Sequence, residues 1–287
     1  SILPTHLLSR FAREKVTVAL SGDGGDELFG GYPTFIAEKI ARAFRLIPQY
    51  VRDHSLRPLV NLVPVSNTYL SFGFKLRRFI EGLDPDVWKM HQRWLGNFRD
   101  GMWQNSLAAP LPKDFDIWEP LAPWRSESAA LSEENSVLWM YLRTYLMDET
   151  VAKMDRASMR ASLEVRSPFL DHTLVEEMFR LPYAYKVRGF TTKFMLKKLM
   201  EGRLPANIMN RPKKGFGVPM ARWFRNELKD LLEEVLSEGQ LKKHGFLDPT
   251  YVKRLKTVHQ SGRDDLSREL WTVLVLQLWF DHWRPRL

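Results

Sequence analysis

The sequence predicts a mainly helical fold with one clear strand. Apolar residues recur at the three- and four-residue spacing of helices through much of the chain, whereas only residues 16–20 read as a good, short, buried strand. That strand leads into the glycine-rich segment SGDGGDELFGGY at residues 21–32, after which apolar character resumes. Strand, glycine-rich turn and helix start is the order of elements that presents backbone N–H groups to a ligand.

The helical pattern predicts the other elements in order. Leu7, Leu8 and Phe11 form the apolar face of a first helix. A later helix begins at Ser132, and another runs from Asp148 toward residue 163. Further helices are expected over residues 191–202, 219–236, 249–260 and 266–283.

A single strand leaves backbone hydrogen-bonding groups unsatisfied on both sides. Either other strands hide in segments that read as helical, or the chain is a fragment whose sheet partners are absent, and we favour the fragment. Because an uncovered edge invites pairing, we expect the edges of the 16–20 strand to be covered. A second copy of the chain, as in a homodimer, is one candidate for that cover.

Composition narrows the class of protein. The formal net charge is +9, but the charge is spread along the chain without a nucleic-acid-binding motif, so we expect an acidic small-molecule partner such as ATP instead. The absence of Cys excludes disulfides, thiol nucleophiles and Cys-ligated metals, and it fits a cytoplasmic setting. The longest apolar stretch, around residues 271–280, is far too short to span a membrane, and no signal peptide is apparent.

The glycine-rich segment carries three acidic residues, Asp23, Asp26 and Glu27. Carboxylates stand beside a polyphosphate only with a cation between them, and Mg²⁺ bridged by one or two carboxylates to phosphate oxygens is the usual arrangement. The glycines would let the backbone approach the phosphate while the acids hold the metal. The alternative is that Asp26 and Glu27 cap the N-terminus of the following helix.

Two other segments concentrate charge among apolar or glycine residues. In VAKMDRASMRASLEVRSPFLD, residues 151–171, the charges would form either a salt-bridged solvated face or a cluster near a ligand. In NRPKKGFGVP, residues 210–219, glycines follow Lys213 and Lys214 and would let a lysine reach a phosphate. An exposed cationic turn is the alternative for this second segment.

Three segments together resemble the glutamine-dependent asparagine synthetases in their order and residue pattern. They are VALSGDGGDELFGGY, KMDRASMRASLEVRSPFLD and LPANIMNRPKKGFGVPMARWF. The resemblance is to their C-terminal synthetase domain and covers nearly the whole chain, as one domain over residues 1–287, although residues 45–130 match only loosely. It implies the C-terminal portion of an adenine-nucleotide α-hydrolase-like (PP-loop ATPase) fold, in which the 16–20 strand is a remnant of the α/β nucleotide-binding layer. It also implies that Mg-ATP activates a carboxylate, usually that of aspartate, as an acyl-adenylate. Ammonia derived from glutamine then attacks, releasing AMP and an amide.

The resemblance also implies roles for the loop and for the lysine segment. The adenylate pocket would be lined by Ser21, Gly22, Asp23 and Gly24, with Asp23 also a catalytic candidate. Asp26 would be a magnesium ligand. Lys213 matches the lysine that contacts the reacting phosphate and stabilises charge on it in the transition state, and Lys214 is less favoured by register.

The middle segment receives weaker assignments from the same resemblance. Glu164 and Arg166 match family positions, with Arg166 either structural or bound to the substrate carboxylate and Glu164 as its partner. Four residues fall near the family's active-site acid and base region: Asp148, Glu149, Lys153 and Asp155. Of these, Glu149 and Asp155 are the catalytic candidates.

The chain departs from the family pattern in two respects. It has no Cys to serve as the glutaminase nucleophile and no SGGxDS pyrophosphate loop. We therefore expect the distal part of a longer enzyme, covalently linked to a glutaminase domain, and no amide formation from glutamine by this chain alone. Because the motifs handle ATP rather than the acceptor, two alternatives stay open. One is a related amidotransferase or lactam-forming synthetase that acts on another carboxylate, and the other is a non-catalytic helical binding module.

Overall fold

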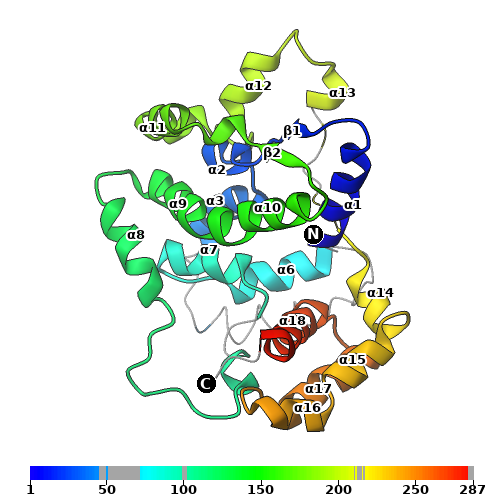
Figure 1. Ribbon diagram of the computed structural model, residues 1–287. Coiled ribbons are helices and arrows are strands. Elements are labelled where there is room, and N and C mark those ends of the chain that lie inside the picture. Colours follow the sequence, from blue (N-terminus) through cyan, green and yellow to red (C-terminus); the bar gives the residue numbers. More distant parts are fainter. Residues whose placement is uncertain are drawn as a thin grey trace. The chain divides into compact units, whose positions relative to one another are not determined.

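The computed structural model describes residues 1–44, 50, 72–98, 102–209, 211, 215 and 217–283. The described part is mostly helical with one small sheet (Figure 1). The chain divides into two compact units. Unit 1 comprises Ser1–Leu46, Asp86–His91 and Ile117–Gly217, and unit 2 comprises Ile47–Pro85, Gln92–Asp116 and Val218–Leu287. One synthetase domain over residues 1–287 stays a prediction.

Unit 1 holds the sheet and the helices around it. Its strands and longer helices are α1 (Ile2–Arg13), β1 (Val18–Leu20), α2 (Gly25–Phe29), α3 (Pro33–Phe44), α8 (Ala122–Glu127), α9 (Glu133–Tyr141), the π-helix η4 (Leu142–Val151), α10 (Ala152–Met159), β2 (Glu164–Arg166), α11 (His172–Arg180), α12 (Phe194–Met200) and α13 (Ala206–Met209). Short 3₁₀ helices are η3 (Glu119–Leu121), η5 (Pro168–Leu170) and η6 (Tyr183–Tyr185).

The described regular elements of unit 2 are helices, apart from an isolated antiparallel bridge between Leu107 and Leu247. Unit 2 contains α6 (Phe72–Glu81), the 3₁₀ helix η2 (Gln104–Ser106), α14 (Met220–Arg225), α15 (Lys229–Val235), α16 (Glu238–His244), α17 (Pro249–Gln260) and α18 (Ser267–Trp283). Helix α7 (Val87–Leu95) contributes residues to both units.

The prediction of one clear strand was incomplete. Strand β1 pairs with β2 in parallel, with Val18 opposite Glu164 and Leu20 opposite Arg166 (Figure 1). The second strand follows directly after the segment that reads as helical, and with three residues in a charged run it is too short to show an alternating pattern. One edge of the predicted strand is therefore covered within the same chain.

The faces of β1 and α1 differ from the predicted ones. Val18 and Leu20 are exposed, so the described structure does not bury β1. On α1, the predicted apolar face is more than half exposed, at 62% for Leu7, 53% for Leu8 and 67% for Phe11. The buried residues of α1 are instead Thr5 and Ser9, whose hydroxyls donate to carbonyls four residues earlier, and α1 packs against α10. Small hydroxyl residues that satisfy their own hydrogen bonds allow this close packing.

Several predicted helices are confirmed. α17 and α18 match the expected ranges closely, and Asp248 caps α17 by accepting from the N–H groups of residues 250 and 251. Ser132 caps α9 as predicted. The range 219–236 splits into α14 and α15, because Asn226 leaves the helical conformation and its side chain donates to the Arg222 carbonyl.

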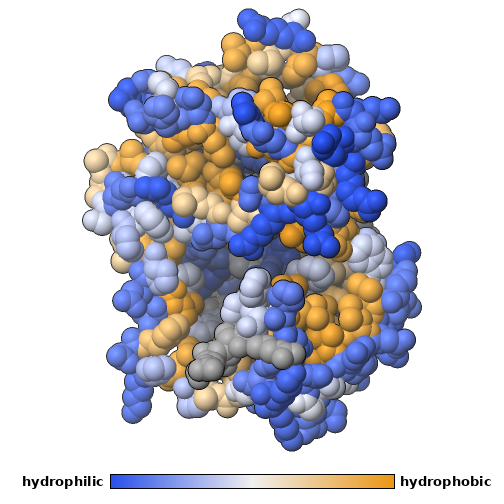
Figure 2. All heavy atoms as spheres, viewed as in Figure 1, coloured by the Kyte–Doolittle hydropathy of each residue, from blue (hydrophilic) through white to orange (hydrophobic). Residues whose placement is uncertain are grey.

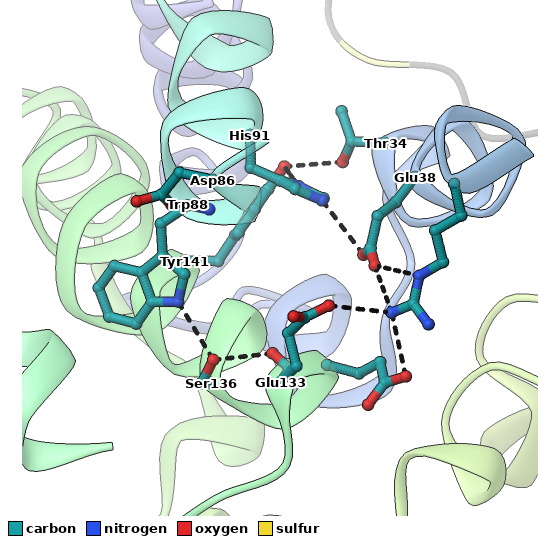
Figure 3. Close-up of polar contacts among 10 residues, drawn as sticks. Thr34, Glu38, Asp86, Trp88, His91, Glu133, Ser136 and Tyr141 are labelled. Carbon is teal, nitrogen blue, oxygen red and sulfur yellow. Dashed lines mark hydrogen bonds and ion pairs between the residues drawn. The ribbon is translucent and has the colours of Figure 1, made fainter. Parts of the chain in front are cut away.

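The core of unit 1 includes a buried polar network (Figure 3). His91 is fully buried, with Nδ1 lying 3.0 Å from the Tyr141 hydroxyl and Nε2 lying 3.2 Å from Glu38 Oε2. The Tyr141 hydroxyl in turn lies 2.7 Å from Thr34 Oγ1. Although burial alone would raise it, hydrogen bonds from His91 and Arg42 hold the pKa of Glu38 below its usual value. The network ties α3, α7 and α9 together.

Helices α14 to α18 of unit 2 enclose a separate apolar core around Phe224, Leu232, Val252 and Leu270. Elsewhere, hydrophobic residues also reach the surface between hydrophilic ones on the face seen in Figure 2.

His259 lies fully buried in unit 2. The N–H of residue 266 donates to His259 Nδ1, and Nε2 lies 3.2 Å from the Ala221 carbonyl oxygen. These contacts fit the neutral ring with its proton on Nε2, and burial together with Arg225 lowers the pKa of His259.

We expect unit 2 to lose stability in mild acid because of His259. Its pKa is lowered in the folded state, so below pH 6.5 the unfolded chain binds the proton first, and the free energy of unfolding falls by up to about 1.4 kcal/mol per pH unit. Urea unfolding at pH 7.5 and 5.5, compared with His259→Gln, measures the effect. Equal pH dependence in both proteins would show that His259 does not carry it.

Candidate functional site

The glycine-rich loop and the residues after β2 meet at the carboxyl ends of the two parallel strands. The Ser21 N–H donates to the Arg166 carbonyl at 2.8 Å. Ser21 Oγ donates to Asp23 Oδ2 at 2.9 Å, so the Ser167 hydroxyl, 2.8 Å away, donates to Ser21 Oγ. The carboxyl ends of parallel strands are where α/β sheets bind ligands. The structure thus joins two sequence segments that are more than a hundred residues apart, through a serine that sequence reasoning did not single out.

Two glycines of the loop have different surroundings. Gly24 has φ +87°, and a Cβ there would lie 2.3 Å from Leu170 Cδ2, so this glycine lets η5 pack against the loop. At Gly22 a Cβ would meet nothing within 4 Å. Gly22 therefore lies on the open side of the loop, whereas Gly24 lies on its packed side.

Gly24→Ala should destabilise the fold by about 2–4 kcal/mol, from a left-handed backbone conformation plus overpacking against Leu170. Gly239→Ala is the matched control, since a Cβ at that helical position meets nothing within 4 Å. Urea denaturation of both variants measures the difference. Similar unfolding midpoints would mean that the loop accommodates the added methyl group without loss of stability.

The two acids at the start of α2 do not cap it. Gly24 is the N-cap and provides no side-chain cap. Glu27 is 1% exposed and accepts from the Tyr32 hydroxyl at 2.6 Å, and burial together with Glu27 raises the pKa of Tyr32. Asp26, in contrast, has a side chain that is 16% exposed, and it forms an ion pair with Lys193 Nζ at 2.8 Å. Neighbouring carboxylates thus have different surroundings, one inside the core and one at the loop.

Glu164 and Arg166 lie two residues apart on β2, and the predicted partnership between them is present. Arg166 Nε donates to Glu164 Oε1 at 2.8 Å. Residues two apart on a strand share a face, which brings these side chains together. Both are exposed, at 52% and 68%, so the pair adds little to stability.

Glu149 and Asp155 are exposed on consecutive helical segments. Glu149 lies in the π-helix η4 and Asp155 in α10, where a single helix was predicted. π-Helical turns are frequent at functional sites. Within the described residues no ion pair joins Glu149 to Lys153 or Arg156, so the salt-bridged face is not observed there. Although η4 packs against α2 and α10 against β2, no hydrogen bond or ion pair of the described chain links Glu149 or Asp155 to the loop.

Lys213 and Lys214 lie outside the described residues. Lys193 was not predicted, because it belongs to none of the three motifs and no spacing marks it. Its unusual conformation, φ +53°, becomes visible only in the structure.

A pocket of about 700 Å³ lies elsewhere in unit 1, lined by parts of α3, the turn before α9 and the segment 179–189. None of the predicted site residues lines it. Its walls mix Glu38 and Glu134 with Arg42 and Arg188. The predicted site is therefore the loop after β1 rather than this pocket.

The described loop does not by itself form a complete metal site. In the described residues no cluster of three or more His, Asp or Glu side chains could hold a metal ion alone. Asp26 offers one carboxylate, and Mg²⁺ commonly takes one or two protein carboxylates together with phosphate oxygens and waters.

None of the described helices is long and apolar enough to pass through a bilayer.

Comparisons with known proteins identify the family. The family model for asparagine synthase matches residues 1–281. The chain belongs to the asparagine synthase family. It is 30% identical over 96% of its length to asparagine synthetase [glutamine-hydrolyzing] 1 of Bacillus subtilis, and it covers 42% of that protein. A putative asparagine synthetase [glutamine-hydrolyzing] of Mycobacterium tuberculosis is 32% identical over 97% of the chain, and the match covers 41% of that relative.

These relatives of the asparagine synthase family are longer than the chain, which spans about two fifths of their length. A third relative, a putative asparagine synthetase of Methanocaldococcus jannaschii, is 42% identical over 54% of the chain. No solved structure gives a significant match. The relatives are named as glutamine-hydrolysing synthetases, which are ligases, so the predicted family is confirmed.

Proposed function

We propose that the protein is an ATP-dependent synthetase that amidates a carboxylate, with aspartate as the first candidate and asparagine as the product. The carboxylate would be activated as an acyl-adenylate, and ammonia derived from glutamine would attack it, releasing AMP and pyrophosphate. The observation that carries the proposal is the junction of the SGDGGDE loop with Ser167 at the carboxyl ends of β1 and β2. Membership of the asparagine synthase family supports it. The two strands would be part of a PP-loop-type nucleotide-binding layer.

The loop residues would bind and orient the nucleotide. Ser21 fixes the Asp23 carboxylate by donating to it, and the open side at Gly22 would admit the adenylate. Asp26 would hold magnesium, which supplies positive charge to the phosphates when it is bound. Lys213 would stabilise charge on the α-phosphoryl group as the leaving pyrophosphate departs.

Arg166 would bind the substrate carboxylate. Its Nε is engaged by Glu164, and its other guanidinium N–H groups form the planar donor set that suits a carboxylate. Exposure of this side chain at the end of β2, next to the loop, supports that role. Glu149 and Asp155 are the candidates for proton transfer to and from the attacking ammonia.

A covalently linked glutaminase domain would supply the ammonia. The relatives are named as glutamine-hydrolysing, and the chain spans only about two fifths of their length. The exposed apolar residues of α1 support a further protein surface against this helix. A homodimer is the second candidate for covering it, and a cytoplasmic location completes the proposal.

The reaction is tested by incubating the full protein with ATP, Mg²⁺, ammonia and a panel of carboxylates. We expect aspartate to produce asparagine, AMP and pyrophosphate in equal amounts. Amidation of another carboxylate alone would favour the related amidotransferase. No carboxylate-dependent cleavage of ATP would contradict the synthetase and favour the helical binding module.

A further inference from the structure

Lys193 forms an ion pair with the Asp26 carboxylate. Its Nζ lies 2.8 Å from Asp26 Oδ1, and the side chains are 30% and 16% exposed. Lys193 immediately precedes α12, far from the loop in sequence. The ammonium therefore occupies the position beside Oδ1 that a bound cation would take.

The backbone at Gly31 leaves space for the ion pair between Asp26 and Lys193. A Cβ on Gly31 would lie 2.0 Å from Asp26 Oδ1 and 2.3 Å from Lys193 Cε, so only glycine leaves room for both side chains. Lys193 itself has φ +53°, a conformation that is costly for a residue other than glycine. Its N–H donates to the Phe29 carbonyl at 3.0 Å, which anchors the lysine to the end of α2. Backbone strain of this kind persists where surrounding contacts enforce it, often at functional sites.

We propose that Lys193 is a positioning residue that serves as the built-in counter-ion of Asp26 and that the metal must displace. It keeps the half-buried carboxylate paired while no metal is bound, which avoids the cost of an uncompensated charge. A divalent cation on the same oxygen, at about 2.1 Å, would be no more than about 5 Å from the ammonium, so the two cations repel each other strongly. Lys193 therefore sets how readily the loop accepts a metal. The inference depends on the proposed function only through Asp26 as the metal ligand.

The test measures binding of Mn²⁺ alone to the nucleotide-free full protein, by the electron paramagnetic resonance signal of free Mn²⁺. Lys193→Met should tighten Mn²⁺ binding about 10-fold, because it removes the competing charge. Lys193→Arg should restore the wild-type affinity. Lys198→Met is the matched control, since it removes an exposed lysine from the helix that follows Lys193 and should leave the affinity unchanged. Circular dichroism melts report whether each variant folds.

Asp26→Asn separates this inference from the proposed function. If Asp26 is the ligand, Asp26→Asn removes the Mn²⁺ binding of the Lys193→Met protein. If Asp26→Asn removes binding but Lys193→Met leaves the affinity unchanged or weaker, the counter-ion inference is wrong and the metal assignment stands. If Lys193→Met binds no Mn²⁺, or if Asp26→Asn changes nothing, both the inference and the metal role of Asp26 are overturned.

Discussion

Lys213→Ala should lower the rate of acyl-adenylate formation by about 100-fold or more in the full protein. The reason is loss of a positive charge that acts on the α-phosphoryl group in the transition state, and removing one such contact typically costs that much. Single-turnover measurement of pyrophosphate release from ATP and aspartate, at saturating concentrations of both, reports the chemical step, because pyrophosphate leaves when the acyl-adenylate forms. The melting temperature should change little, which separates the loss of chemistry from loss of fold.

Lys214→Ala is the matched control for Lys213→Ala, because it removes the lysine adjacent to Lys213 in the sequence. We expect a much smaller effect on pyrophosphate release. If the two effects were reversed, the register of the lysine assignment would be wrong by one residue. If neither variant slowed the reaction, the segment would be only an exposed cationic turn.

Asp26→Asn should reduce magnesium-dependent AMP formation by at least about 10-fold and raise the Mg²⁺ concentration needed for half-maximal activity. Asparagine keeps the size of the side chain but loses the charge that attracts the ion. Because Asp26 is only 16% exposed and its substitution removes the carboxylate that pairs with the Lys193 ammonium, the free energy of unfolding should also fall, by about 1–3 kcal/mol. Titration of Mg²⁺ in the AMP assay, together with a urea melt, measures both quantities.

Glu27→Gln is the contrasting variant, since it neutralises the neighbouring carboxylate. Glu27 is buried and accepts a hydrogen bond from Tyr32, so its substitution should reduce stability without changing the Mg²⁺ requirement. An unchanged Mg²⁺ requirement in Asp26→Asn, or a raised one in Glu27→Gln, would remove the metal assignment from Asp26.

The long helices could be predicted because their apolar periodicity and caps are local properties of the sequence. α17 and α18 are the clearest cases, and Ser132 marks the start of α9. β2 could not be predicted, because three residues carry no periodic signal and the partner strand lies far away in sequence. The packing of α1 was also misjudged. Periodicity indicates which face is apolar, and tertiary contacts decide which face is buried.

The contacts of the candidate site that lie within one sequence segment could be predicted. The glycine-rich motif predicted the Ser21–Asp26 loop, and the family resemblance predicted the Glu164–Arg166 partnership, although the strand that carries this pair was not predicted. Lys193 and Ser167 could not be found this way, because their importance comes from contacts with a distant loop. The different surroundings of Asp26 and Glu27 were likewise invisible, since burial separates two acids that look alike in sequence.

Oxygen transfer from the acceptor tests the central claim most directly. The full protein is incubated with ATP, Mg²⁺, ammonia and aspartate labelled with ¹⁸O in its side-chain carboxylate. If a carboxylate oxygen attacks the α-phosphorus, the C–O bond breaks when ammonia displaces AMP, and one ¹⁸O appears in each AMP. Mass spectrometry of the nucleotide should therefore show singly labelled AMP in the same amount as asparagine. Unlabelled AMP, or ADP with ¹⁸O in inorganic phosphate, would contradict an acyl-adenylate formed at this loop.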